Sequence, residues 1–173
     1  TGKLRNPVTF WQKMRALPPA QDPVPRSLRL LFKRLMPEPG LSWSLRHRVS
    51  GVGSLGRPRY VALADWRGGM IAREAKALAP SAVVWARSGR ETTSPYQSIV
   101  DQAVRSADPF LQLHGTWIVR RLSPYCSRID LATLPKKRDE GLLLYTMGRE
   151  TANVHLGSQD AIGAVRQDLS KRK

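Results

Sequence analysis

The chain has 173 residues, of which 41% are hydrophobic, and it carries a formal net charge of +16. This length and composition predict one domain with a buried core, or two small lobes. They exclude a membrane span, because no apolar run is long enough, and no signal peptide is visible. The single cysteine, Cys126, excludes an internal disulfide and predicts a reducing, cytoplasmic location. Because the sequence starts at Thr1 without an initiator Met, we expect a processed or excised chain.

The positive charge is concentrated near the N-terminus. Residues 1–60 contain 12 Lys and Arg against 2 acidic residues, whereas the remainder contains 17 against 11. Such an excess predicts attraction to nucleic acid and other polyanions. A solvated basic surface, or a face that contacts an acidic missing part of the protein, is the favoured alternative. No zinc-finger spacing, aromatic-interleaved strand or basic helix followed by heptads accompanies the charge.

Residues 1–40 predict a linker with two helices. The first spans residues 8–17 and ends at Pro18. The second spans residues 26–36, with Ser27 as its cap and Pro37 as its stop. Its apolar stripe has helical spacing and consists of Leu28, Leu31, Phe32 and Leu35. Its basic side is expected to be solvated, and a helix lying on a membrane is the less favoured alternative.

Residues 41–125 predict an antiparallel sheet of five strands with one packed helix. Alternating apolar residues indicate strands over residues 41–50, 59–64, 70–78, 110–115 and 116–122. Hairpin turns are expected over residues 65–69 and at Gly115, residues 80–93 read as a loop, and residues 95–107 read as a helix. The predicted fold class is therefore α+β, with the composition of a protein-kinase-like small lobe.

Residues 126–173 predict the start of a helical lobe. A long helix is expected over residues 136–156, followed by a polar stretch with a basic end. Gly148, Ala152 and His155 share one side of that helix at i, i+4 and i+7. His155 is expected to be a packed or interfacial histidine, because no acidic partner lies near it in sequence. Cys126 and three histidines give no metal-ligand spacing.

The stretch from Gly51 to Gly56 reads Gly-Val-Gly-Ser-Leu-Gly and joins two predicted antiparallel strands. A dinucleotide-binding motif needs such glycines to open a helix, and a Walker loop needs a following Gly-Lys-Ser/Thr. This stretch has neither feature, which argues against both motifs. A plain glycine-rich turn remains an alternative. The setting favours a protein-kinase-type lid, in which the glycine loop covers phosphates and a lysine on the third strand reaches them.

The remaining candidate site residues follow from that lid. Lys76 lies on the third predicted strand, 20 residues after Gly56, and a solvent-facing lysine is its alternative role. Asp101 is the acid in the middle of the next helix and would orient Lys76, although an i, i+4 pair with Arg105 explains it equally simply. Arg120 lies near the predicted hinge and, with Arg121, would help to bind an anion. The predicted phosphate-binding set is Gly51, Gly53, Ser54, Gly56, Lys76, Asp101 and Arg120.

Several of these segments together resemble the bacterial family two-two-five-two of domains of unknown function. The matching segments are residues 48–56 with 59–61, Glu74-Ala75-Lys76, Val100-Asp101, residues 119–122, and the spacing of Gly148, Ala152 and His155. The resemblance covers residues 45–156, and the glycine run with Glu-x-Lys is its most specific part. Asp101 stands where the family usually has Glu.

The resemblance implies a distant relation to protein-kinase-like and aminoglycoside-phosphotransferase-like enzymes. In that family a Gly-Asp-x-His-x-x-Asn motif and an acidic metal-binding segment precede the glycine loop, and neither is found here. The chain would then be the C-terminal half of such a protein or a degenerate member, inactive alone. ATP is the implied cofactor, and Mg²⁺ would bind only if the missing N-terminal half supplied ligands. The alternatives are a non-catalytic basic module for nucleic acid or an acidic partner, and a pseudo-enzyme scaffold.

Overall fold

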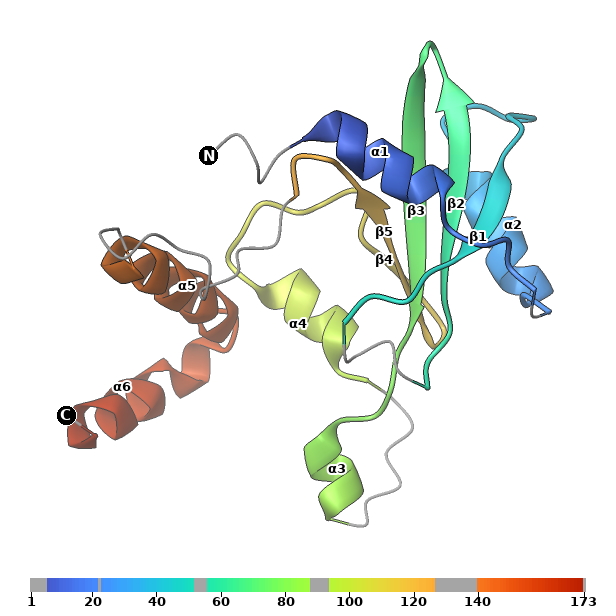
Figure 1. The fold of residues 1–173 in the computed structure, drawn as a ribbon. Coiled ribbons are helices and arrows are strands. Elements are labelled where there is room, and N and C mark those ends of the chain that lie inside the picture. The colour runs from blue at the N-terminus through green and yellow to red at the C-terminus, as the bar shows by residue number, and fades with distance from the viewer. Residues whose placement is uncertain (1–5, 22, 52–55, 88–93, 127–139, 173) are drawn as a thin grey trace. The chain divides into compact units, whose positions relative to one another are not determined.

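The computed structural model describes residues 6–21, 23–51, 56–87, 94–126 and 140–172 (Figure 1). Within those ranges the chain forms a five-stranded antiparallel sheet and six α-helices, which confirms the predicted α+β class. The chain divides into two compact units. The sheet unit comprises Thr1–Ala79 and Pro109–Ile129, and the helical unit comprises Pro80–Asp108 and Asp130–Lys173.

The sheet has the strand order β1-β2-β3-β5-β4, and every neighbouring pair is antiparallel. Its strands are β1 (Ser44–His47), β2 (Arg59–Trp66), β3 (Gly69–Ala77), β4 (Gln112–His114) and β5 (Trp117–Leu122). The predicted β2–β3 hairpin is confirmed, with its turn at Arg67 and Gly68, where φ is 48° and 77°. Trp66 lies opposite Gly69, and the same register brings Arg59 opposite Lys76.

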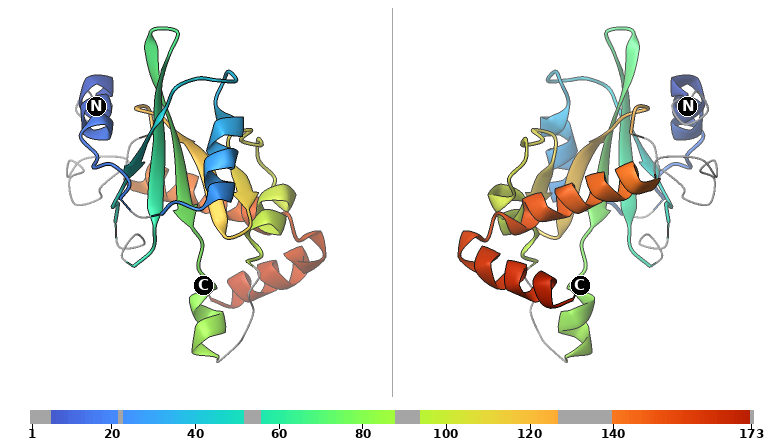
Figure 2. Two further views of the ribbon diagram at one scale, coloured as in Figure 1. Left: turned by 90° about the vertical axis from the view of Figure 1, so that its right-hand side faces the viewer. Right: turned by 90° about the vertical axis from the view of Figure 1, so that its left-hand side faces the viewer.

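Two helices cover opposite faces of the sheet (Figure 2). Helix α2 (Arg26–Leu35) buries its predicted apolar stripe, most completely at Leu28 and Phe32, against residues of β2, β3 and β5. Helix α1 (Pro7–Arg15) places Met14 against Val61, Leu63 and Ala72 on the other face. Each helix therefore has its own hydrophobic cluster, and β2 and β3 contribute alternate residues to the two.

The ends of these helices follow simple capping chemistry, with one correction. Asn6 caps α1, because its side-chain oxygen accepts a hydrogen bond from the Thr9 N–H at 3.1 Å. The predicted cap at Ser27 is wrong, since α2 begins one residue earlier, at Arg26, directly after Pro25. At the other end of α2, Arg73 Nε donates to the Leu35 carbonyl at 3.3 Å.

Arg73 is buried although it is charged. Burial lowers the pKa of its guanidinium, and the neighbouring Arg121 lowers that pKa further. A cation at the C-terminal end of a helix is favoured by the helix dipole and by the last free carbonyl groups. Arg73 thus has a structural role, which is to attach the end of α2 to the sheet.

The helical unit contains α3 (Ala82–Ala86), α4 (Tyr96–Gln102), α5 (Glu140–His155) and α6 (Ile162–Lys171), with a 3₁₀ turn at Gln159–Ala161. Three predictions are corrected here. Helix α3 lies in the segment predicted as a loop, α4 ends before the predicted residue 107, and α6 occupies the predicted polar stretch. The apolar stripe of α6 consists of Ile162, Val165 and Leu169, at i, i+3 and i+7.

Helices α4 and α5 meet where α5 ends. The Val104 N–H donates to the Asn153 carbonyl at 2.9 Å. A Cβ atom at Gly157 would lie 2.6 Å from the Gln102 carbonyl oxygen, so only glycine fits there. Among the helices of the described ranges, none combines the length and the apolar character needed to cross a membrane.

Substitution of Phe32 tests the importance of the α2 face. Phe32 is fully buried in the α2 cluster, so Phe32→Ala should lower the free energy of unfolding by about 3–5 kcal/mol. Leu30 of the same helix is 57% exposed, so Leu30→Ala should change it by less than about 0.5 kcal/mol. Urea unfolding of the whole chain measures both values. Equal losses would contradict the orientation of α2.

Candidate functional site

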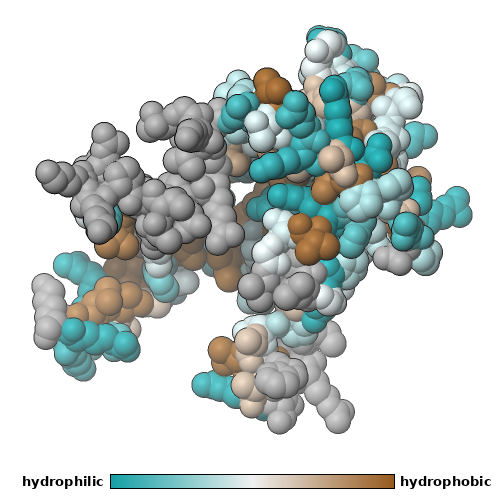
Figure 3. Space-filling model, in the orientation of Figure 1, coloured by the Kyte–Doolittle hydropathy of each residue, from teal (hydrophilic) through white to brown (hydrophobic). Residues whose placement is uncertain are grey.

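Beyond the hydrophobic cluster of α1, charged side chains occupy the same face of the sheet. Residues that lie directly opposite each other on neighbouring antiparallel strands share a face. One such row consists of Arg46, Val61, Glu74 and Arg120. The next row towards the glycine run consists of Arg48, Arg59, Lys76 and Ile118. These rows bring together five cations and one carboxylate, and the face drawn in Figure 3 is mostly hydrophilic over the sheet unit.

Glu74 is the centre of this group, and its side chain is fully buried. One carboxylate oxygen, Oε1, accepts hydrogen bonds from Arg48 Nη1 and, at 3.5 Å, from Arg59 Nη1. The other, Oε2, accepts from Arg120 through Nε at 2.9 Å and lies 2.8 Å from Arg120 Nη2. Charge-assisted bonds of this kind stabilise a carboxylate that has lost its water. We call Glu74 with Arg48, Arg59 and Arg120 the arginine cluster.

Arg59 is the most buried arginine of the cluster, since only 6% of it is exposed. Burial lowers the pKa of its guanidinium, attraction to Glu74 opposes that shift, and repulsion from Arg48 and Arg120 adds to it. Arg59 Nε is buried without a hydrogen-bond partner, as are Arg46 Nε and Trp66 Nε1 elsewhere in the described ranges. An arginine stays charged in a protein, so Arg59 carries its positive charge in a position where water solvates it poorly.

Lys76 lies next to the arginine cluster. It follows Glu74 by two residues on β3, so both side chains are on one face, and it is half-buried. Three guanidinium groups and one ammonium group face a single carboxylate in this set. The side chain that sequence analysis selected for phosphate contact is therefore part of a larger cationic group. The predicted Arg120 belongs to it as well.

The glycine run follows β1 at the same end of the sheet. The prediction that it joins two antiparallel strands is confirmed by the pairing of β1 with β2. Gly51 and Gly56 both have φ of +69°, a conformation that side chains other than glycine rarely adopt. The predicted site residues Gly53 and Ser54 lie outside the described residues. The two ends of the run thus require glycine for the path of the backbone.

Asp101 is the predicted site residue that belongs to the helical unit. It is exposed on α4, and its Oδ1 accepts a hydrogen bond from Gln97 Nε2 at 2.6 Å. Arg105, the alternative partner at i+4, lies beyond the end of α4. Because Lys76 belongs to the sheet unit, the expected contact between Asp101 and Lys76 stays a prediction.

Sequence analysis missed Glu74, Arg48 and Arg59 as site residues. Two signals were available. Glu74 precedes Lys76 by two residues and so shares its face, and Arg59 lies opposite Lys76 as soon as the hairpin turn is placed at Arg67 and Gly68. The nearest carboxylate along the chain is therefore on the strand of Lys76 itself, and not on the following helix, where Asp101 was expected to act.

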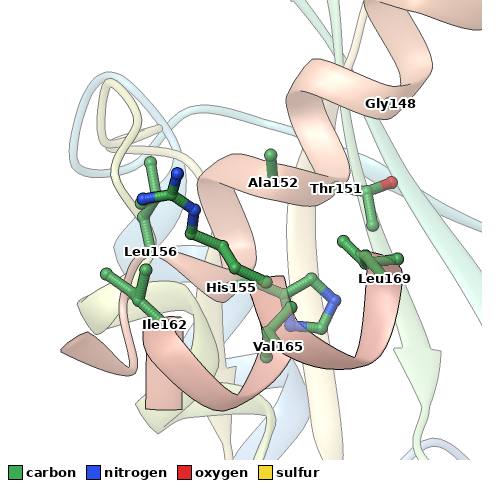
Figure 4. Close-up of a pocket in the computed structure, with 9 residues that line it drawn as sticks. Gly148, Thr151, Ala152, His155, Leu156, Ile162, Val165 and Leu169 are labelled. Carbon is green, nitrogen blue, oxygen red and sulfur yellow. The ribbon is translucent and has the colours of Figure 1, made fainter. Parts of the chain in front are cut away.

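The helical unit contains a different kind of concavity, a groove of about 490 Å³ between α5 and α6 (Figure 4). Its lining is mainly apolar and includes Gly148, Ala152 and His155, which confirms that these three share one side of α5. Figure 4 shows His155 reaching from α5 towards Val165 and Leu169 of α6. The groove has the chemistry of a packing surface, and its small residues leave space for larger apolar side chains.

No metal centre is formed by the part of the chain that the structure describes, since no three His, Cys, Asp or Glu side chains gather there. Comparison of the chain with protein-family models, with curated proteins and with solved structures finds no match.

Removal of the central carboxylate should be costly. Glu74→Ala leaves three guanidinium groups without their shared partner, so we expect a loss of about 3–5 kcal/mol in the free energy of unfolding. Glu38, which forms an exposed pair with Arg67 at 3.4 Å, is the matched control. Glu38→Ala should cost no more than about 1 kcal/mol. Chemical denaturation compares the two variants, and similar small losses would contradict a central role for Glu74.

Proposed function

We propose that the sheet unit binds a nucleotide, ATP first, or another phosphate-bearing ligand on its α1 face, at the end next to the glycine run. One observation carries this proposal. The arginine cluster and Lys76 supply four cations against one carboxylate, and one of the buried donors, Arg59 Nε, has no partner. Phosphate oxygens are the ligands that guanidinium and ammonium groups match best.

The order of parts along the chain supports a kinase-like small lobe. A glycine-rich turn joins the first two strands, a lysine lies on the third, and a helical segment precedes the fourth. In protein kinases the loop covers the phosphates and the third-strand lysine contacts them. In this proposal Gly51, Gly53, Ser54 and Gly56 cover the phosphates, while Lys76 and Arg120 contact them and Asp101 orients Lys76. The resemblance to family two-two-five-two points the same way.

The proposed role is binding and positioning rather than turnover by this chain alone. Phosphoryl transfer needs a residue that orients the nucleophile and carboxylates that hold Mg²⁺. Within the described ranges no three His, Cys, Asp or Glu side chains gather to hold a metal ion. We therefore propose that an ATP-dependent phosphotransferase activity requires a separate catalytic half, which would supply the base and the metal ligands.

Nucleotide titrations test this proposal directly. Isothermal calorimetry with ATP should detect binding, and Lys76→Ala should weaken it about tenfold or more, because a charge-assisted phosphate contact is lost. Lys33→Ala removes an equal charge from the exposed side of α2 and should leave the affinity unchanged. No binding at millimolar ATP, or equal affinities of the wild type and Lys76→Ala, would contradict nucleotide binding.

The charge distribution favours one alternative, a basic module that binds nucleic acid or an acidic partner. The sheet unit contains 18 Lys and Arg but only 4 Asp and Glu, which gives +14 of the total +16. In this alternative the whole surface of the unit contributes, and the glycine run is only a turn. Neither Lys76 nor the arginine cluster then has a special role.

The two functions differ in their dependence on salt and on Lys76. Nucleic-acid binding through phosphate contacts should weaken steeply as salt rises. Lys33→Ala and Lys76→Ala should then reduce oligonucleotide binding by similar small factors, as measured by fluorescence anisotropy. No anisotropy change with single- or double-stranded oligonucleotide at low salt would exclude this alternative.

A further inference from the structure

The charge and the width of the arginine cluster limit the size of the anion that it can bind. We infer that this site takes a ligand with at least two linked phosphate groups, and that Glu74 is a positioning residue that holds Arg48, Arg59 and Arg120 for it. This inference rests on the proposed function of the same face. It adds the ligand class and assigns a role to a residue that touches the ligand only through its arginine partners.

The positive charges on this face outnumber the negative one. Glu74 neutralises one of three guanidinium groups, and Lys76 adds a further positive charge on the same face. The uncompensated charge in the absence of ligand is therefore three. A monoanion would leave most of it in place, whereas a diphosphate or triphosphate supplies enough negative charge to balance it.

The four cations are spread across the width of the sheet, which also favours linked phosphates. The cations come from four positions across the sheet: Arg48 after β1, Arg59 on β2, Lys76 on β3 and Arg120 on β5. Neighbouring strands are about 4.8 Å apart, so these backbone positions span roughly 14 Å. One tetrahedral phosphate contacts only part of such an array, and linked phosphates reach along it.

The exposure of the individual side chains gives Glu74 its role. Glu74 is fully buried, whereas 48% of the Arg120 side chain and 20% of the Arg48 side chain are exposed. Arg48 and Arg120 can thus reach a ligand, whereas Glu74 and Arg59, whose side chain is only 7% exposed, lie below them. By bonding both oxygens to the three guanidinium groups, Glu74 limits their rotamers before any ligand arrives, which lowers the entropy lost on binding.

Calorimetry with inorganic phosphates tests the ligand class. Pyrophosphate, tripolyphosphate and orthophosphate are titrated separately into the whole chain at constant ionic strength and without metal. We expect pyrophosphate and tripolyphosphate to bind at least tenfold more tightly than orthophosphate. Equal affinities for all three, or tighter binding of orthophosphate, would overturn the inference.

Two neighbouring arginines on opposite faces provide a matched comparison. Arg120→Gln removes an exposed member of the arginine cluster and should weaken pyrophosphate binding about tenfold or more. Arg121, expected from the sequence to act with Arg120, lies on the other face, where it stacks on the Phe110 ring. Arg121→Gln removes the same charge and should therefore leave binding unchanged. Arg121→Gln should unfold at nearly the wild-type temperature, because its side chain is exposed. Arg120→Gln removes a partner of the buried Glu74 and should unfold at a lower temperature, so binding is compared where both variants are folded. Equal effects on binding would overturn the assignment of this site.

Glu74→Gln tests positioning separately from stability. The amide keeps the shape of the carboxylate but no longer attracts the three guanidinium groups. We expect the preference for pyrophosphate over orthophosphate to fall to less than threefold, whatever happens to the melting temperature. An unchanged preference would show that Glu74 has only a structural role. If the variant fails to fold, the Arg120→Gln and Arg121→Gln pair decides the assignment.

The outcomes also separate this inference from the proposed nucleotide function. Tight pyrophosphate binding without ATP binding supports the inference and contradicts the nucleotide part of the proposal. ATP binding that depends on Lys76, with pyrophosphate no better than orthophosphate, supports the function and overturns the inference. Absence of binding by ATP, pyrophosphate and orthophosphate overturns both.

Discussion

The sheet unit depends on one buried negative charge. Glu74 lies in the central strand β3, where its carboxylate has no access to water, so it must be satisfied by cations from both sides. Arg59 and Arg120 approach it from β2 and β5, and Arg48 approaches from the residue that follows β1. The ion network therefore fixes the lateral arrangement of the strands at the end where hydrophobic packing stops. It also makes that end of the sheet positively charged.

The two faces of the sheet differ in the side chains that they bury. On the α2 side, an apolar cluster runs from Val24 and Phe32 to Tyr60 and Val119, and the buried Arg73 meets the carbonyl at the end of α2. On the α1 side, apolar residues occupy the end near the β2–β3 turn, and charged rows replace them towards the glycine run. A change from packing to uncompensated charge along one face is typical of a binding site on a stable scaffold.

Much of the sheet could be predicted, because its strands have clear alternation and its hairpins have positive-φ turns at Gly68 and Gly115. The candidate site was predicted only in part. The turn at Arg67 and Gly68 determines that Arg59 lies opposite Lys76, but the partner of Glu74 on β5 depends on pairing between strands that are more than 40 residues apart. The alternation of apolar residues within each strand does not determine the register between β3 and β5. Helix α6 was missed for a different reason, since its polar residues concealed a short apolar stripe.

The chemistry of the arginine cluster limits what this chain can do. Fixed guanidinium groups can neutralise phosphate oxygens, which is one of the tasks that Mg²⁺ performs in phosphoryl transfer. They cannot accept a proton from a nucleophile, because an arginine stays protonated in a protein. Glu74 is not free to do so either, since both its oxygens already accept bonds from arginines. A phosphate ligand on this face would be bound and oriented by the arginine cluster, and any transfer of its terminal group would need a proton acceptor other than these residues.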